Sequence, residues 1–405
     1  MTFSRRKLLY GTFFILIIFD NVLSSIIPGF NYFDELILGY SILYLVSHKL
    51  TKRLQYGIII ICMICMLVIG LLGNLIWHYN NGYIVVIKDV IAFIKMPITA
   101  IAFSRLGEKK KCNEALETAY KLSKIILLIM TVILPVSVVL NNNMIMEYRH
   151  GLPSYRFVYS HATFMVYSVL LMLGVLIAHG AKKKDYLFHG CALVLLFFSM
   201  RDKAFVAIAL YFFIMVIFPN LKRIKIHYVI LAAIGAIIVT YDKISMYLSF
   251  SWSPRFGLYS AGIKILAMCF PLGSGFGTFA STLSGEYYSK LYYMYGFSSR
   301  TAAFVTESNY SDLGDAGLPY YYAQFGIIGF VLFAVILYCI YKIVITKYKL
   351  TPSKRRAAFL VMGYMAFALV VENVFVNSTG ATAMVFLFLF LGSGSDTCIS
   401  CSNYN

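Results

Sequence analysis

The chain has 405 residues, of which 60% are hydrophobic and only 13% are charged. Soluble domains carry about 25% charged residues, and a single soluble core stops growing at about 250–300 residues. Together with a mean hydropathy of +0.78, these values exclude a soluble protein and indicate a polytopic membrane protein.

The formal net charge of +18 raises the question of nucleic acid binding, and the distribution of the charge answers it. Lys and Arg gather in short clusters between apolar stretches, so that every second inter-span segment is basic. This is the positive-inside pattern of membrane proteins, and we therefore expect no nucleic acid partner. The clusters lie at 5–7, 49–53, 105–111, 182–184, 222–225 and 342–356.

Apolar stretches of about 20 residues are long enough to cross the hydrocarbon core of a membrane. The first one follows a basic segment without a clear cleavage site, which indicates a retained helix. The pattern predicts an all-α fold, one polytopic domain over 1–405 with about twelve transmembrane helices and both termini in the cytoplasm. The predicted spans lie near 9–27, 33–48, 56–77, 84–104, 123–140, 159–179, 186–200, 203–219, 227–241, 318–341, 357–376 and 381–394.

Two external connections are longer than the others, at 141–158 and 242–317. The second is the one large hydrophilic segment of the sequence, and its five basic and five acidic residues balance. Loops of this length are usually functional. Within it, a short apolar helix is expected after Arg255, ended by Pro271.

Gly273, Gly275 and Gly277 then allow a tight backbone turn. A glycine-rich backbone can present N–H groups to a phosphate, although a plain return from the short helix explains the same pattern. Tyrosines follow, among them Tyr292, and these suit either a membrane-interface belt or a platform for sugar rings.

Five arginines lie on the external side, against the topological bias: Arg149, Arg156, Arg201, Arg255 and Arg300. A guanidinium group binds two oxygens of a pyrophosphate at once, but a surface arginine beside lipid headgroups is the alternative. The surface interpretation is preferred for Arg149 and Arg300. Function is favoured for Arg201 and Arg255, because each stands where a helix is expected to begin.

Acidic residues precede the tenth predicted span, at Glu307, Asp312 and Asp315. A carboxylate there can act as a general base or can cap the next helix, and capping is the simpler interpretation for each taken alone. Lys88, Asp89, Lys95 and Glu372 lie inside predicted spans, where charged groups indicate function or local pairing.

Eight cysteines are spread over the chain, mostly within apolar spans, where they act as small hydrophobic residues. Two pairs have C-x-x-C spacing, Cys62 with Cys65 and Cys398 with Cys401, but neither has a neighbouring His or Cys to complete a zinc site. The sequence therefore predicts neither a metal site nor a cofactor.

Two stretches, "RFGLYSAGIKILAMCFPLGSGFGTF" from Arg255 and "DAGLPYYYAQFGIIG" from Asp315, resemble bacterial cell-surface polysaccharide polymerases of the Wzy type and the related O-antigen ligases. "SMRDKAFVA" is similar to the segment that carries an arginine of this family, here Arg201. The segment "RHGLPSYRFVYSHATF" resembles the family's approach to the sixth span. The resemblance covers mainly 149–330. Ligases carry a histidine where this chain has Asp315, which favours a polymerase and leaves the catalytic base open.

The resemblance implies transfer of an oligosaccharide from undecaprenyl pyrophosphate at the outer face of the bacterial cytoplasmic membrane, without metal or cofactor. The product would be a capsule, O-antigen or exopolysaccharide. A ligase-type transferase and a flippase for lipid-linked sugars are the alternatives, the latter with Lys88, Lys95 and Glu372 along its path. A flippase and a chain-length regulator of the same pathway are expected partners. The implied catalytic residues are Asp315, Arg255 and Arg201, and the implied substrate-binding residues are Arg156, Gly273, Gly275, Gly277, Tyr292 and Arg300.

Overall fold

The computed structural model describes residues 5–48, 53–107, 112–180, 183–217, 253–300, 305–347 and 351–392. These residues are nearly all helical, apart from one short two-stranded sheet and the connections. The α-helices are α1 Arg5–Ile18, α2 Asp20–Ile26, α3 Phe33–Ser47, α4 Leu54–Trp77, α5 Tyr83–Leu106, α6 Cys112–Leu140, α7 Ala162–His179, α8 Tyr186–Phe198, α9 Asp202–Phe212, α11 Pro254–Met268, α12 Thr282–Glu286, α13 Lys290–Met294, α14 Phe297–Arg300, α15 Gly317–Lys342, α16 Pro352–Val371 and α17 Ser378–Val385.

Within the described residues, four helices are long and apolar enough to cross a membrane: α4, α6, α7 and α15. The pair α1 and α2 makes a fifth if it is one span, bent by 76° at Phe19. The described residues therefore form a nearly all-α fold with several helices that could cross a membrane, and twelve spans remain a prediction. α5 has the length of a span but carries Lys88, Asp89 and Lys95. The ninth predicted span, 227–241, lies outside the described residues.

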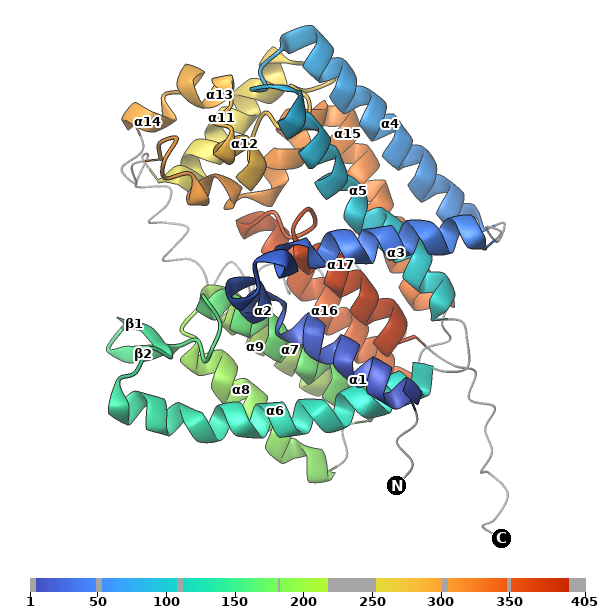
Figure 1. The fold of residues 1–405 in the computed structure, drawn as a ribbon, viewed down its shortest axis with the longest axis vertical. Helices are drawn as coiled ribbons and strands as arrows, with labels where there is room; N and C mark the ends of the chain where they lie inside the picture. The colour runs from blue at the N-terminus through green and yellow to red at the C-terminus, as the bar shows by residue number, and fades with distance from the viewer. Residues whose placement is uncertain are drawn as a thin grey trace.

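The helices form two groups that meet along a central seam (Figure 1). In one group, α15 packs against α4 and α11, and α4 against α5. In the other, α7 packs against α6, α8 and α16, and α16 against α9. α17 and α3 lie at the seam, where both contact α5. α7 is buried along almost its whole length, so it forms the core of the second group.

Local sequence signals explain where several helices begin. Ser253 accepts a hydrogen bond from the N–H of Phe256 and precedes Pro254, so a cap and an N-terminal proline together start α11. His161 caps α7 in the same way, and Gly180 ends it in the left-handed conformation. The short apolar helix expected after Arg255 is thus observed, as α11, and it ends at Met268 before Pro271.

The predicted external connection at 141–158 contains a β-hairpin. Strand β1 (Ile145–Arg149) pairs antiparallel with β2 (Leu152–Tyr155) across His150 and Gly151, at φ 51° and 76°. Positive φ at both central residues is the signature of a type I′ turn, which matches the twist of a two-residue hairpin. A register shift between Ile145 and Glu147 leaves Met146 as an extra, bulged residue.

Residues 253–300 and 305–317 are packed into the first helix group and are not a solvated loop. The turn that carries the three glycines is fixed by hydrogen bonds to α4, α5 and α15. Asn74 bonds both the N–H and the carbonyl of Phe276, and Gly275 donates to the carbonyl of Gln324. Helix α15 is kinked at Gly326, φ 64°, where it passes this turn. The polar groups of the glycine turn thus form hydrogen bonds within the protein.

Candidate functional site

A cavity of about 2140 Å³ lies at the seam between the two helix groups. Its walls come from the α1–α2 bend, the start of α3, the middle of α5, strand β1, the starts of α7, α9, α11 and α17, and the end of α16. Segments distant in the sequence therefore meet here. The predicted catalytic residues Arg201, Arg255 and Asp315 all line this cavity.

Arg255 and Asp315 form an ion pair across sixty positions of sequence. The Arg255 Nη2 donates to Asp315 Oδ2 at 3.0 Å, and its Nε donates to the Asp315 carbonyl at 2.9 Å. The Asp315 side chain is 48% exposed, because it faces the cavity, yet protein surrounds it on its other sides. Burial raises the pKa of Asp315 above its ordinary value, and the charges of Arg255 and Lys203 reduce that rise.

The alternative role of Asp315 as a helix cap is not the one seen. The N-cap position of α15 is Ala316, which makes no side-chain cap, and the Asp315 carboxylate turns instead to Arg255. A carboxylate that faces a cavity and is fixed by a guanidinium can accept a proton from a bound hydroxyl group.

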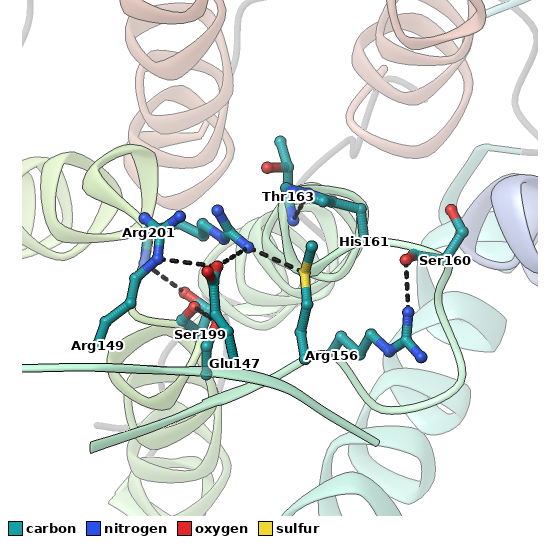
Figure 2. A network of polar contacts seen from close by, with 10 residues as sticks. Glu147, Arg149, Arg156, Ser160, His161, Thr163, Ser199 and Arg201 are labelled. Carbon is teal, nitrogen blue, oxygen red and sulfur yellow. Dashed lines mark hydrogen bonds and ion pairs between the residues drawn. The ribbon is translucent and has the colours of Figure 1, made fainter. Parts of the chain in front are cut away.

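A second cationic group lies on β1 and at the start of α9 (Figure 2). Glu147 Oε1 accepts from Arg149 Nε at 2.9 Å and from Arg201 Nη2 at 2.8 Å. Burial alone would raise the pKa of Glu147, but the two arginines outweigh it and lower that pKa. Arg149 and Arg201 both line the cavity, so two guanidinium groups meet there on one carboxylate oxygen.

Two further residues join this cationic wall to the Arg255–Asp315 pair. Lys203, in the first turn of α9, pairs with Glu372 at the end of α16. His161 accepts a hydrogen bond at Nδ1 from the N–H of Thr163, so this nitrogen carries no proton and the ring is neutral. Both residues line the cavity.

Another part of the cavity wall carries acidic residues around a lysine. Lys95 on α5 donates to Asp34 Oδ2 and to Glu35 Oε1, each at 2.5 Å, and Asp20 lies nearby at the α1–α2 bend. Lys95 and Glu372, which the sequence places inside predicted spans, are therefore locally paired, as Lys88 is with Glu286. The pairing interpretation of these charges fits the structure, and all three still line the cavity.

The three glycines do not form a phosphate cradle, which corrects the prediction for Gly273, Gly275 and Gly277. Their N–H groups donate to the Cys269 carbonyl, the Gln324 carbonyl and Asp89 Oδ2. A Cβ atom on Gly273 or Gly275 would stand 2.3 or 2.4 Å from backbone nitrogen of α15 or α4. The glycines thus permit close backbone packing, and none of them lines the cavity.

Tyr292 is also corrected, from sugar platform to core residue. Its side chain is 0% exposed, and its hydroxyl accepts from the N–H of Ala280 and pairs with Ser284 Oγ. Arg156 turns away from the cavity, because its guanidinium donates to the carbonyls of Asn143 and Ser160 (Figure 2). Arg300 is the last residue of α14, and its side chain lies outside the described part of the chain.

The sequence did not single out Glu147, and it favoured a surface position for Arg149, which lines the cavity instead. The available signals were the two-residue turn at His150 and Gly151, which predicts a hairpin, and the i, i+2 spacing that places both side chains on one strand face. The acids Asp34 and Glu35 were missed inside the second predicted span.

Cations on one wall offer contacts to an anionic group. No three His, Cys, Asp or Glu side chains are grouped as metal ligands in the parts of the chain that the structure describes. Comparison of the chain with family models, with curated proteins and with solved structures finds no match.

Proposed function

We propose that this chain is a membrane glycosyltransferase that polymerises oligosaccharide repeat units carried on undecaprenyl pyrophosphate. The observation that carries the proposal is the convergence of Arg201 and the Arg255–Asp315 pair on one large cavity in a membrane protein. Pockets for single small molecules measure about 300–1000 Å³. A cavity of about 2140 Å³ supports a reaction between two large substrates.

The chemistry needs a proton acceptor and a cationic wall. The acceptor hydroxyl oxygen attacks the anomeric carbon of the donor, and its proton passes to Asp315. The new C–O bond forms as the bond from that carbon to the diphosphate oxygen breaks, and the lipid diphosphate leaves with the electron pair. Cations such as Arg201 and Arg255 stabilise the leaving group, whose charge grows in the transition state. Asp315 then returns its proton to the diphosphate or to water.

The residue at 315 favours a polymerase over the related ligases. The resemblance around Arg255 and Asp315 is shared by both groups, but ligases carry a histidine at this position and this chain has a carboxylate. We place the reaction at the outer face of the bacterial cytoplasmic membrane, with a flippase and a chain-length regulator of the same pathway as partners.

Deletion of the gene tests the proposal. We expect the cells to accumulate single lipid-linked repeat units and surfaces capped with one unit, and to lack long polymer on a gel. The wild-type gene should restore the polymer ladder. A gene copy that encodes Asp315→Asn, expressed at the same protein level, should not. Units trapped on the cytoplasmic side, with no surface sugar at all, would instead identify a flippase.

An assay with the purified enzyme distinguishes a polymerase from a ligase. Lipid-linked units extracted from the deletion strain should be joined into a ladder by the detergent-solubilised chain alone. A ligase would make no ladder from these units and would need a second, different acceptor.

A further inference from the structure

Glu147 brings two arginines of different elements together at the cavity wall (Figure 2). Because Arg149 Nε and Arg201 Nη2 both donate to the single oxygen Oε1, the two guanidinium groups stand side by side. Two like charges held this close repel each other, and the carboxylates of Glu147 and Asp202 offset them. Glu147 Oε1 accepts only one N–H from each guanidinium, and a guanidinium carries five N–H donors, so the pair can also donate to an anion in the cavity.

Arg201 also has a donor without an acceptor among the residues that the structure describes. Its side chain is only 11% exposed, and no described group accepts a hydrogen bond from its buried Nε–H. Leaving a buried charged donor unsatisfied is costly, so such a group usually marks a place where a ligand or water binds. Burial, together with the charge of Arg149, lowers the pKa of Arg201, which a bound anion would reverse.

The hairpin that carries Arg149 is anchored, so the pair is formed before any ligand arrives. Ser154 Oγ donates to the carbonyl of Ser199, two residues before Arg201, and the Tyr155 hydroxyl donates to the carbonyl of Met130. The bulge at Met146 sets Glu147 and Arg149 on the inward face of β1. Preorganised groups lose little entropy when they bind.

Resting on the proposed function, we propose that Arg149 and Arg201 form a two-guanidinium clamp for the diphosphate of a prenyl-linked substrate. Glu147 is its positioning residue. Paired planar forks match the oxygens of two adjacent phosphates, which a lysine cannot do. The same cavity is lined by Phe164, Leu210 and Phe213, and these apolar side chains suit the first isoprene units. The site is thus fitted to a lipid diphosphate and not to free pyrophosphate.

Binding to the purified full chain tests the clamp with two probes, farnesyl diphosphate and inorganic pyrophosphate. Titration calorimetry in detergent should show farnesyl diphosphate binding at least about tenfold more tightly, since the apolar wall contributes to it alone. Arg149→Ala should weaken both probes by about ten- to a hundredfold, as expected for loss of a charge-assisted contact. Arg149→Lys should recover only part of this loss.

The test of Glu147 must distinguish positioning of the two arginines from a purely structural role. Glu147→Gln keeps an oxygen that accepts from both arginines and removes the competing negative charge, so farnesyl diphosphate should bind as tightly as to wild type or more tightly. Glu147→Ala releases the arginines and should weaken binding by at least about fivefold. Arg156→Gln is the matched control, because it loses a charge on the same segment but outside the cavity, and its affinity should stay unchanged.

Other results overturn the clamp. If Arg149→Ala or Arg149→Lys lowers the melting temperature while both probes bind as to wild type, the network only holds the hairpin. Equal affinities for the two probes would indicate a site for free diphosphate. A loss of affinity in Arg156→Gln as large as that in Arg149→Ala would indicate a non-specific charge effect.

Failure of the clamp and failure of the polymerase proposal remain distinguishable. If the probes bind through Arg149 and Arg201 but the deletion strain still makes long polymer, the clamp stands and the proposed function falls. If the deletion strain loses polymer and Arg149→Ala restores it fully, the clamp falls alone.

Discussion

Arg201 and Arg255 could be chosen from the sequence because each stands where a predicted helix begins. Asp315 was chosen through the family resemblance, since its place before a helix favoured capping. Their partners could not be chosen in this way. Arg255 and Asp315 are sixty positions apart, and Glu147 meets Arg201 across fifty-four. Pairings of this kind depend on how helices pack in space, which local patterns do not encode.

The electrostatics of Asp315 lead to a prediction about pH. A general base works when deprotonated, so activity should rise with pH through its pKa. Burial raises this pKa, and the charge of Arg255 opposes the rise. Arg255→Gln should therefore raise the pKa further and move the acidic limb of the polymerisation rate to higher pH. Arg255→Lys keeps the charge and should leave the limb in place, while the rate falls about ten- to a hundredfold because the two-pronged contact is lost.

Rates of the purified variants between acid and neutral pH would measure this shift, with protein amounts matched by immunoblot. An acidic limb that stays at the wild-type position in Arg255→Gln would show that Asp315 is not the base. Full polymer from Arg255→Ala would remove Arg255 from the site altogether.

At the scale of elements, the clearest difference between sequence and structure is the glycine turn. Its glycines and polar residues suggested a ligand-binding loop. A turn that packs against the backbone of neighbouring helices has the same composition, so the sequence did not separate the two. In the structure the acceptors are supplied by Asn74, Asp89 and Gln324 on neighbouring helices. A second signal was present in the glycines of the neighbouring helices, because Gly73 on α4 and Gly326 on α15 lie directly against the backbone of the turn.

This packing role predicts a large effect of one methyl group. Gly275 has φ +97°, and a Cβ atom there would lie 2.4 Å from the Asn74 nitrogen. Gly275→Ala should destabilise the fold by about 2–5 kcal/mol, the sum of backbone strain and overpacking. Gly57→Ala on α4 is the matched control, because its Cβ would meet nothing within 4 Å. It should change stability by no more than about 1 kcal/mol, in the stabilising direction.

Thermal unfolding of the two variants in the same detergent gives the comparison. Gly275→Ala with a wild-type melting temperature would mean that the turn is not tightly packed and would reopen its role as a binding loop.

At the scale of the whole molecule, composition predicted a helical membrane protein, and the described residues are nearly all helical. Helix α8 has only 13 residues and is separated from α9 at Ser199–Arg201, while α9 continues as a π-helix over Phe213–Ile217. The spans expected over 186–200 and 203–219 therefore stay predictions. The break at Phe19 likewise divides the first predicted span. Both interruptions lie at the cavity, where non-helical backbone is tolerated because it faces protein or water and not lipid.

The orientation of this arrangement yields the last prediction. Helix α7 is mostly apolar and has 18 residues, about 27 Å of length, close to the thickness of the hydrocarbon core. It separates the hairpin, where Tyr148 is 55% exposed, from the basic segment at Lys183 and Lys184. We therefore predict that the two lie on opposite faces of the membrane, and by the positive-inside rule we expect the lysines in the cytoplasm.

Thiol labelling tests this orientation in a chain whose eight cysteines have been replaced. A membrane-impermeant maleimide should label Tyr148→Cys in intact cells and Lys184→Cys only after permeabilisation. The reverse labelling pattern would show the inverted orientation, with Arg149 and Arg201 on the cytoplasmic side. A lipid-linked donor at the outer leaflet could not then reach the site, whereas labelling of both positions in intact cells would show that α7 does not cross the membrane.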